Sequence, residues 1–103
     1  EIYVSGSSDN HNIYHYGQLN VSNDAYAETT MTNRAHKSIT YYNSFVGLSD
    51  TKKKETIVHE VGHCFGLDHC QTSKQSISVM RATGFNNKAY PLSDDKAGIS
   101  AIY

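Results

Sequence analysis

The chain has 103 residues, 38% of them hydrophobic, and its nine basic and ten acidic side chains give a net charge of −1. This length fits a single small domain over residues 1–103, and the balanced charge is unlike that of a nucleic-acid groove. No apolar run approaches the roughly 20 residues that cross a bilayer. We therefore expect neither a nucleic-acid partner nor a membrane span.

The first half of the chain is typical of β-strands. Residues 1–6 and 38–45 are rich in β-forming residues, and residues 25–32 alternate and carry three threonines, which indicates a half-exposed strand. Residues 13–21 are ambiguous, because Gly17 interrupts their alternation. Turn signals keep the connections short. Strands 25–32 and 38–45 are therefore expected to pair antiparallel.

A helix is predicted over about residues 50–65, where the spacing of apolar residues changes from a period of two to one of 3.6. Either Ser49 or Asp50 is suited to cap its first turn. Gly66 is suited to end it, because glycine readily takes the left-handed conformation of a helix C-terminus.

The last part of the chain is predicted to be a loop-rich stretch, 67–92, followed by a short helix over about 93–103. Ser93 would cap this helix, and the two aspartates after it would lie favourably in the first turn. Strands followed by helices indicate an α+β domain.

The stretch HEVGHCFGLDH, residues 59–69, combines residues that bind zinc. His59 and His63 are four residues apart on the predicted helix, so both can face one ion. Gly66 lets the chain turn back, and His69 can then approach the same ion. Three imidazoles leave the fourth position of a tetrahedral zinc ion open, which is typical of a catalytic site.

Glu60 directly follows the first of these histidines. From there its carboxylate can reach a water molecule at the metal without being a ligand, which is the position of a general base. The alternative is a polar patch on a helix, but a match at all five fixed positions rarely arises by chance. We therefore expect one catalytic Zn²⁺ ion.

The pattern HExxHxxGxxH is the zinc-binding motif of the metzincin metalloproteases, and the chain resembles this family over roughly residues 25–103. Within SVMRATG, Met80 stands where the resemblance places the Met-turn beneath the zinc. The end, YPLSDDKAGISAIY, is similar to the closing helix of the matrixins. Ala82 stands where astacins and serralysins have an additional tyrosine ligand, and no glutamate follows Glu60 to provide the third ligand of thermolysin-like enzymes.

The resemblance implies a small zincin-type α+β domain with a mixed β-sheet, whose antiparallel edge strand, 25–32, binds an extended peptide. Ala27 and Thr29 on this strand are candidate substrate-binding residues. Residues 83–90 would form the wall of the pocket for the side chain that follows the cut bond. Tyr90 would either stabilise the oxyanion there or simply pack.

Cys64 and Cys70 flank the turn at Gly66. A disulfide between them would fix the angle at which His69 approaches the metal, although so short a loop gives little chain-entropy stabilisation. Two buried thiols, or Cys70 as a further zinc ligand, are the alternatives. Archaemetzincins also have a cysteine after the third histidine, but they carry further cysteines that this chain lacks.

The long helix that usually precedes the metzincin sheet has no counterpart in the first 48 residues. The chain is expected to be either a minimal member or one that lacks the N-terminal part of the domain. Apolar residues such as Ile2, Val4, Ile39 and Tyr41 would then need cover from an N-terminal segment or a partner chain.

These observations predict a zinc-dependent endopeptidase that is secreted or extracellular and acts on peptides or proteins. The alternative is a zinc-binding module, or a catalytically impaired fragment of a larger metalloprotease. A second metal site at the other histidines, His11, His15 and His36, is not expected, because they lack acidic partners in a suitable pattern.

Overall fold

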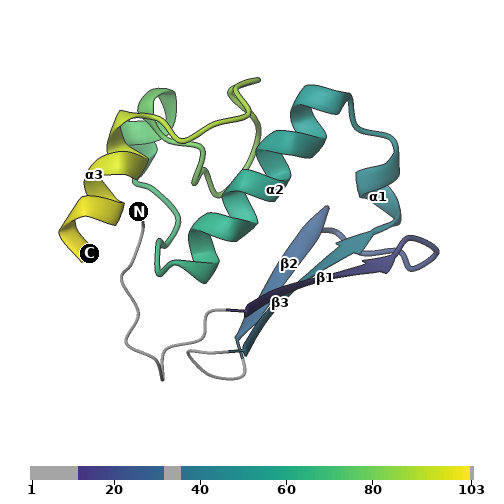
Figure 1. Cartoon of the computed structure of the whole chain (residues 1–103). Helices are drawn as coiled ribbons and strands as arrows, with labels where there is room; N and C mark the ends of the chain where they lie inside the picture. The colour runs from purple at the N-terminus through teal and green to yellow at the C-terminus, as the bar shows by residue number, and fades with distance from the viewer. Residues whose placement is uncertain (1–11, 32–35, 103) are drawn as a thin grey trace.

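The structure is a computed structural model that describes residues 12–31 and 36–102. The strand expected at 1–6, with Ile2 and Val4, lies outside the described residues. The observed elements are three strands, three α-helices and one 3₁₀ helix: β1 (Asn12–Gln18), β2 (Ala27–Met31), β3 (His36–Tyr42), α1 (Asn43–Val46), α2 (Asp50–Cys64), η1 (Thr72–Ile77) and α3 (Ser93–Ile102) (Figure 1).

The strands form one mixed sheet in the order β1-β3-β2. β2 pairs antiparallel with β3, with Thr29 opposite Ile39, which confirms the expected pairing. β1 pairs parallel with β3. Because β3 occupies the middle, β2 has a neighbour on one side only among the described residues, and its other edge is free to pair with a further strand.

Helix α2 crosses one face of this sheet (Figure 1). The core between them contains Ala27, Ile39, Tyr41 and Cys64, and Ile39 is completely buried. The expectation that Ile39 and Tyr41 need cover from elsewhere is therefore wrong, because α2 of the same chain covers them. The alternation of β3 directs these two residues to the helix and Thr40, which lies between them, to the opposite face.

The two ends of α2 follow the predicted signals. The Ser49 hydroxyl accepts a hydrogen bond from Lys52 N–H at 3.3 Å, so Ser49 is the N-cap. At the other end Gly66 has φ +100°. Gly66 N–H donates to His63 O and Leu67 N–H donates to Gly62 O, each at 3.0 Å. This pair of bonds is a Schellman motif, which ends the helix and reverses the chain.

Helix α3 begins at Ser93, close to the predicted position, but Ser93 is its first helical residue rather than its cap. The buried carboxylate of Asp95 instead reaches back and accepts from Leu92 N–H at 2.9 Å. The same carboxylate accepts from Ser78 Oγ at 2.5 Å and from Val79 N–H at 2.9 Å. Asp95 thus connects α3 to the segment that precedes Met80.

Helices α1 and η1 are short and were not predicted from the sequence. Within the described residues, no helix precedes α1 in the chain. None of the described helices is long and apolar enough to cross a membrane.

Candidate metal centre

Three histidines converge at the C-terminal half of α2. His59 and His63 lie one turn apart on the helix, and His69 returns to them from the loop after Gly66. Their candidate ligand atoms all lie within 4.8 Å of one another. The Nε2 atoms of His59 and His63 are 3.1 Å apart. A tetrahedral zinc ion bound at about 2.0–2.1 Å holds two nitrogens about 3.3 Å apart, so this spacing fits zinc.

Backbone carbonyls set the tautomer of the two helical histidines. Nδ1 of His59 lies 2.7 Å from Val79 O, and Nδ1 of His63 lies 2.8 Å from Leu67 O. A carbonyl oxygen can only accept, so each Nδ1 carries the proton and each Nε2 presents a lone pair. This is the arrangement of a metal-binding histidine with a supporting hydrogen bond behind it.

Burial also favours the neutral form of His59. Desolvation lowers the pKa of His59 below its ordinary value, and this effect outweighs the hydrogen bond to Val79 O, which acts in the opposite direction. Metal binding requires a neutral imidazole, because a proton on Nε2 occupies the lone pair. His69 is the exposed member of the three.

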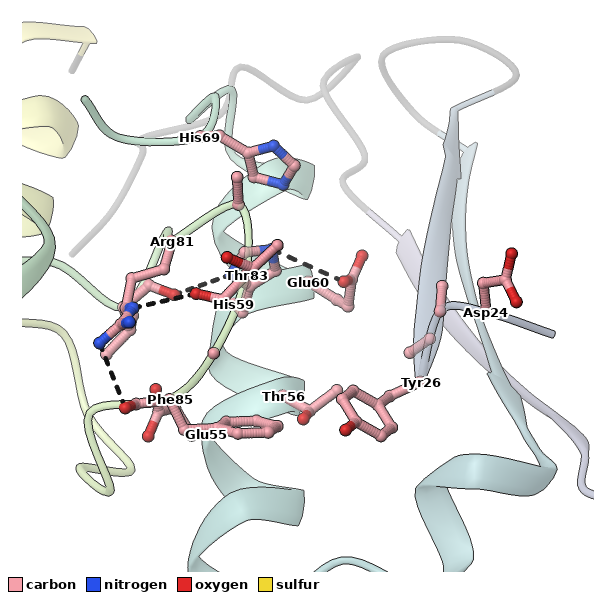
Figure 2. A pocket seen from close by; sticks show the side chains of 15 residues that line it. Asp24, Tyr26, Glu55, Thr56, His59, Glu60, His69, Arg81, Thr83 and Phe85 are labelled. Atoms are coloured by element: carbon pink, nitrogen blue, oxygen red, sulfur yellow. Dashed lines mark hydrogen bonds and ion pairs between the residues drawn. The ribbon is translucent and has the colours of Figure 1, made fainter. Parts of the chain in front are cut away.

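Glu60 lies beside the three histidines and is 7% exposed. One carboxylate oxygen, Oε2, is 3.8 Å from Nε2 of His59. The other, Oε1, accepts a hydrogen bond from Thr29 Oγ1 at 2.6 Å. Figure 2 shows Glu60 between His59 and the strand that follows Tyr26. The hydroxyl of Thr29, a candidate substrate-binding residue, therefore points at the glutamate.

Met80 packs beneath the turn of α2 that carries the histidines. Its side chain is 2% exposed, and a Cβ built on Gly62 would lie 2.6 Å from its Sδ. The carbonyl of Met80 accepts from Cys70 N–H at 2.7 Å. The absence of a side chain at Gly62 therefore allows the helix to pack directly on the methionine.

Cys64 and Cys70 are free cysteines, so the expected disulfide is not formed. Cys64 is buried in the core under the sheet, with Ile39 and Tyr41, whereas Cys70 lines a hollow next to α3. The turn at Gly66 thus sends the two side chains to different sides. Burial raises the pKa of the Cys64 thiol, although the nearby ammonium of buried Lys37 opposes this.

A pocket of about 410 Å³ opens next to His59. Its walls come from the start of β2, from α2 and from the segment after Val79. The rings of Tyr26 and Phe85 face each other across one end of it, with centroids 5.5 Å apart (Figure 2). Tyr90, expected in this wall, is 54% exposed and is not among the residues that line the pocket.

Internal hydrogen bonds fix the pocket wall. Arg81 Nε donates to Thr83 O at 3.1 Å, and Arg81 Nη1 donates to Asn86 Oδ1 at 2.9 Å. The buried carboxylate of Glu55, one turn before His59, accepts from the N–H groups of Asn86 at 2.8 Å and Lys88 at 3.0 Å. These residues were not predicted from the sequence. Glu55 could have been found from its position, because it is a charged residue on the inward face of an amphipathic helix.

Another hollow, of about 530 Å³, lies between β2 and residues 66–69, next to His63. Both hollows are lined in part by Ala27, Glu60 and His69. The three residues thus stand in the middle of a groove that extends in both directions along β2.

The matrixin family model matches residues 9–103. The chain belongs to the matrixin family. No curated protein and no solved structure matches it. Matrixins are zinc-dependent metallopeptidases, typically secreted or extracellular.

The donor set of this matrixin fits zinc. Each of the three histidines offers a nitrogen, the helical pair is oriented by carbonyls, and their spacing suits a tetrahedral ion. Among the described residues, no other group of three or more potential ligand side chains comes together. Of the histidines considered for a second site, His15 bonds to the hydroxyl of Tyr41 at 2.7 Å. His11 and the side chain of His36 lie outside the described part.

Proposed function

We propose that this matrixin is a zinc-dependent endopeptidase whose single ion is held by His59, His63 and His69. The convergence of these three ligands beside the buried carboxylate of Glu60 supports this assignment. Zinc, when bound, supplies a Lewis acid that polarises the peptide carbonyl and makes water easier to deprotonate.

Glu60 is the general base in this proposal. Its Oε2 faces the histidines, so it can accept a proton from the attacking water. As the water oxygen bonds to the carbonyl carbon and the C–N bond breaks, Glu60 delivers that proton to the leaving amine. The products are a carboxylic acid and an amine, and the glutamate returns to its ionised form.

The substrate would lie along the free edge of β2 as an additional strand, through main-chain bonds to the segment that includes Ala27 and Thr29. The pocket next to His59 would take the side chain after the cut bond. Its closure by Tyr26 and Phe85 favours an apolar side chain of moderate length. Because the groove continues on both sides of Glu60, it suits a cut inside a chain rather than at its end.

Gly66 and Met80 would support the site without touching substrate. The left-handed turn at Gly66 brings His69 back toward the helix. Met80 packs against Gly62 and so braces the turn between His59 and His63, in the manner of a Met-turn. Secretion is proposed on the family's typical location alone.

The test is cleavage of denatured casein by the zinc-loaded protein. We expect internal fragments, their loss with a chelator and in Glu60→Gln, and one zinc ion per chain by elemental analysis. His63→Gln should lose the zinc, whereas the matched variant His15→Gln, on β1, should keep both zinc and cleavage. Stoichiometric zinc without cleavage by the folded wild type would instead indicate a zinc-binding module.

A further inference from the structure

Thr29 and Glu60 form a side-chain hydrogen bond between the sheet and the helix, although they are 31 residues apart in the chain. Thr29 Oγ1 lies 2.6 Å from Glu60 Oε1 and 3.2 Å from the backbone carbonyl of the same residue. A carboxylate accepts, so the hydroxyl donates. The contact therefore holds Glu60 at both its backbone and its side chain.

The two carboxylate oxygens of Glu60 have different surroundings. Oε1 is occupied by the Thr29 hydroxyl, whereas Oε2 lies on the side of the histidines, 3.8 Å from Nε2 of His59. A glutamate side chain has three rotatable bonds, and a buried one has few water molecules to hold it. The bond to Thr29 selects the orientation in which Oε2 faces the metal side.

Thr29 is itself held in place. Its β-branched side chain lies on the face of β2 that packs against α2, where rotation about χ1 is restricted. The Cys64 thiol, which is buried in the core, is close enough to this hydroxyl for Thr29 to affect its pKa.

We propose that Thr29 is a positioning residue for the general base, and that it ties Glu60 to the strand on which the peptide docks. This inference rests on the proposed function of Glu60. The backbone of Thr29 would pair with the substrate while its side chain orients the carboxylate. A peptide seated on β2 is thereby placed in register with the base.

The decisive variant is Thr29→Val, which keeps the shape and strand preference of threonine but removes the donor. Misplacement of a catalytic group by about 1 Å costs on the order of a hundredfold. We expect kcat to fall about ten- to a hundredfold while KM changes less than about twofold, because the peptide still pairs with the backbone of β2. Thr29→Ser, which retains the hydroxyl, should recover most of kcat.

Two controls separate positioning from a structural effect. Thr40→Val makes the same change on the central strand, on the face away from α2, and should leave kcat unaltered. In a Glu60→Gln background, Thr29→Val should have no further effect on the residual rate, because the group that it positions is gone. Zinc affinity, measured by competition with a chelator, should be equal in all of these proteins.

A readout without catalysis is the crystal structure of the metal-free variants. We expect the Glu60 carboxylate in one orientation in Thr29→Ser and in several in Thr29→Val. A single unchanged orientation together with unchanged kcat in Thr29→Val would overturn the inference, as would equal losses in the valine and serine variants. If the wild type cleaves nothing, the proposed function fails, and the carboxylate orientations still decide the role of Thr29.

Discussion

Gly62 lies on α2 between His59 and His63, and its missing side chain leaves the space that Met80 fills. A Cβ added at this position would stand 2.6 Å from Sδ and 3.2 Å from Cε of the methionine. Since Met80 is only 2% exposed, its side chain would have to shift against its packed neighbours to make room. Gly62→Ala therefore has two effects on stability: it improves helix propensity and it worsens the packing against Met80.

The two effects have opposite signs. Alanine stabilises a helix interior by about 0.5–1 kcal/mol relative to glycine. Forcing a methyl group into a filled core costs about 1–3 kcal/mol. We expect the clash to win, with a net loss of about 1 kcal/mol, which lowers the melting temperature by roughly 4–8 °C for a domain of this size.

The assay is thermal unfolding of the zinc-loaded protein in two backgrounds. With Met80→Ala, the atoms that clash are removed, and the remaining neighbour, Leu67 Cδ1 at 3.6 Å, is in ordinary contact. Gly62→Ala should then become stabilising by about 0.5–1 kcal/mol. Gly47→Ala is the matched control, because its added Cβ meets nothing within 4 Å.

The reversal of sign is the critical outcome. If Gly62→Ala stabilises the wild type as it stabilises the Met80→Ala protein, then Met80 does not pack under the histidine turn. The proposed support of the zinc site by this methionine would then be wrong. Equal destabilisation in both backgrounds would show that the cost comes from some neighbour other than Met80.

Two further predictions concern buried polar groups. Asp95→Asn replaces an acceptor that serves Ser78 and two backbone N–H groups, and should lower the free energy of unfolding by about 1–3 kcal/mol in a urea titration; an equal loss in the neighbouring Asp94→Asn would contradict this. Burial raises the pKa of Tyr41 to about 12, so the phenolate is disfavoured in the folded state. The contribution of Tyr41 to the free energy of unfolding should be complete below about pH 10. It should fall by about 1–2 kcal/mol as the pH rises through 12, because solvent screens part of the effect. Tyr41→Phe should lack this alkaline loss, and identical pH curves for the two proteins would refute the assignment.

Features that depend on neighbours in the chain were accessible from the sequence. The spacing of His59 and His63, the cap at Ser49 and the turn at Gly66 each involve residues within about one helical turn of one another. Hydrogen-bond rules and backbone preferences act at that range, so the pattern of residues is sufficient. The antiparallel pair β2–β3 was predictable for a similar reason, because a short connection leaves few other arrangements.

Features that depend on packing between distant segments were not accessible. Cys64 and Cys70 flank the same turn, yet one side chain enters the core and the other faces α3. Tyr90 lies in the expected segment but points outward. The backbone carbonyl of Val79 orients His59. Every residue has such a carbonyl, so the identity of Val79 does not predict this contact.

The sequence by itself determined the candidate chemistry of this matrixin: three imidazoles, a carboxylate and a glycine turn, in a spacing that α2 converts into a candidate zinc site. The tertiary structure decided how that chemistry is held. Only the docking of β2 against α2 places the Thr29 hydroxyl on Glu60, and only the fold of the chain after η1 places Met80 beneath Gly62. The spacing of the histidines is a local property of α2 and the turn after it. The orientation of Glu60 and His59 instead depends on Thr29, 31 residues before Glu60, and on Val79, 20 residues after His59. Such contacts are selected by packing alone.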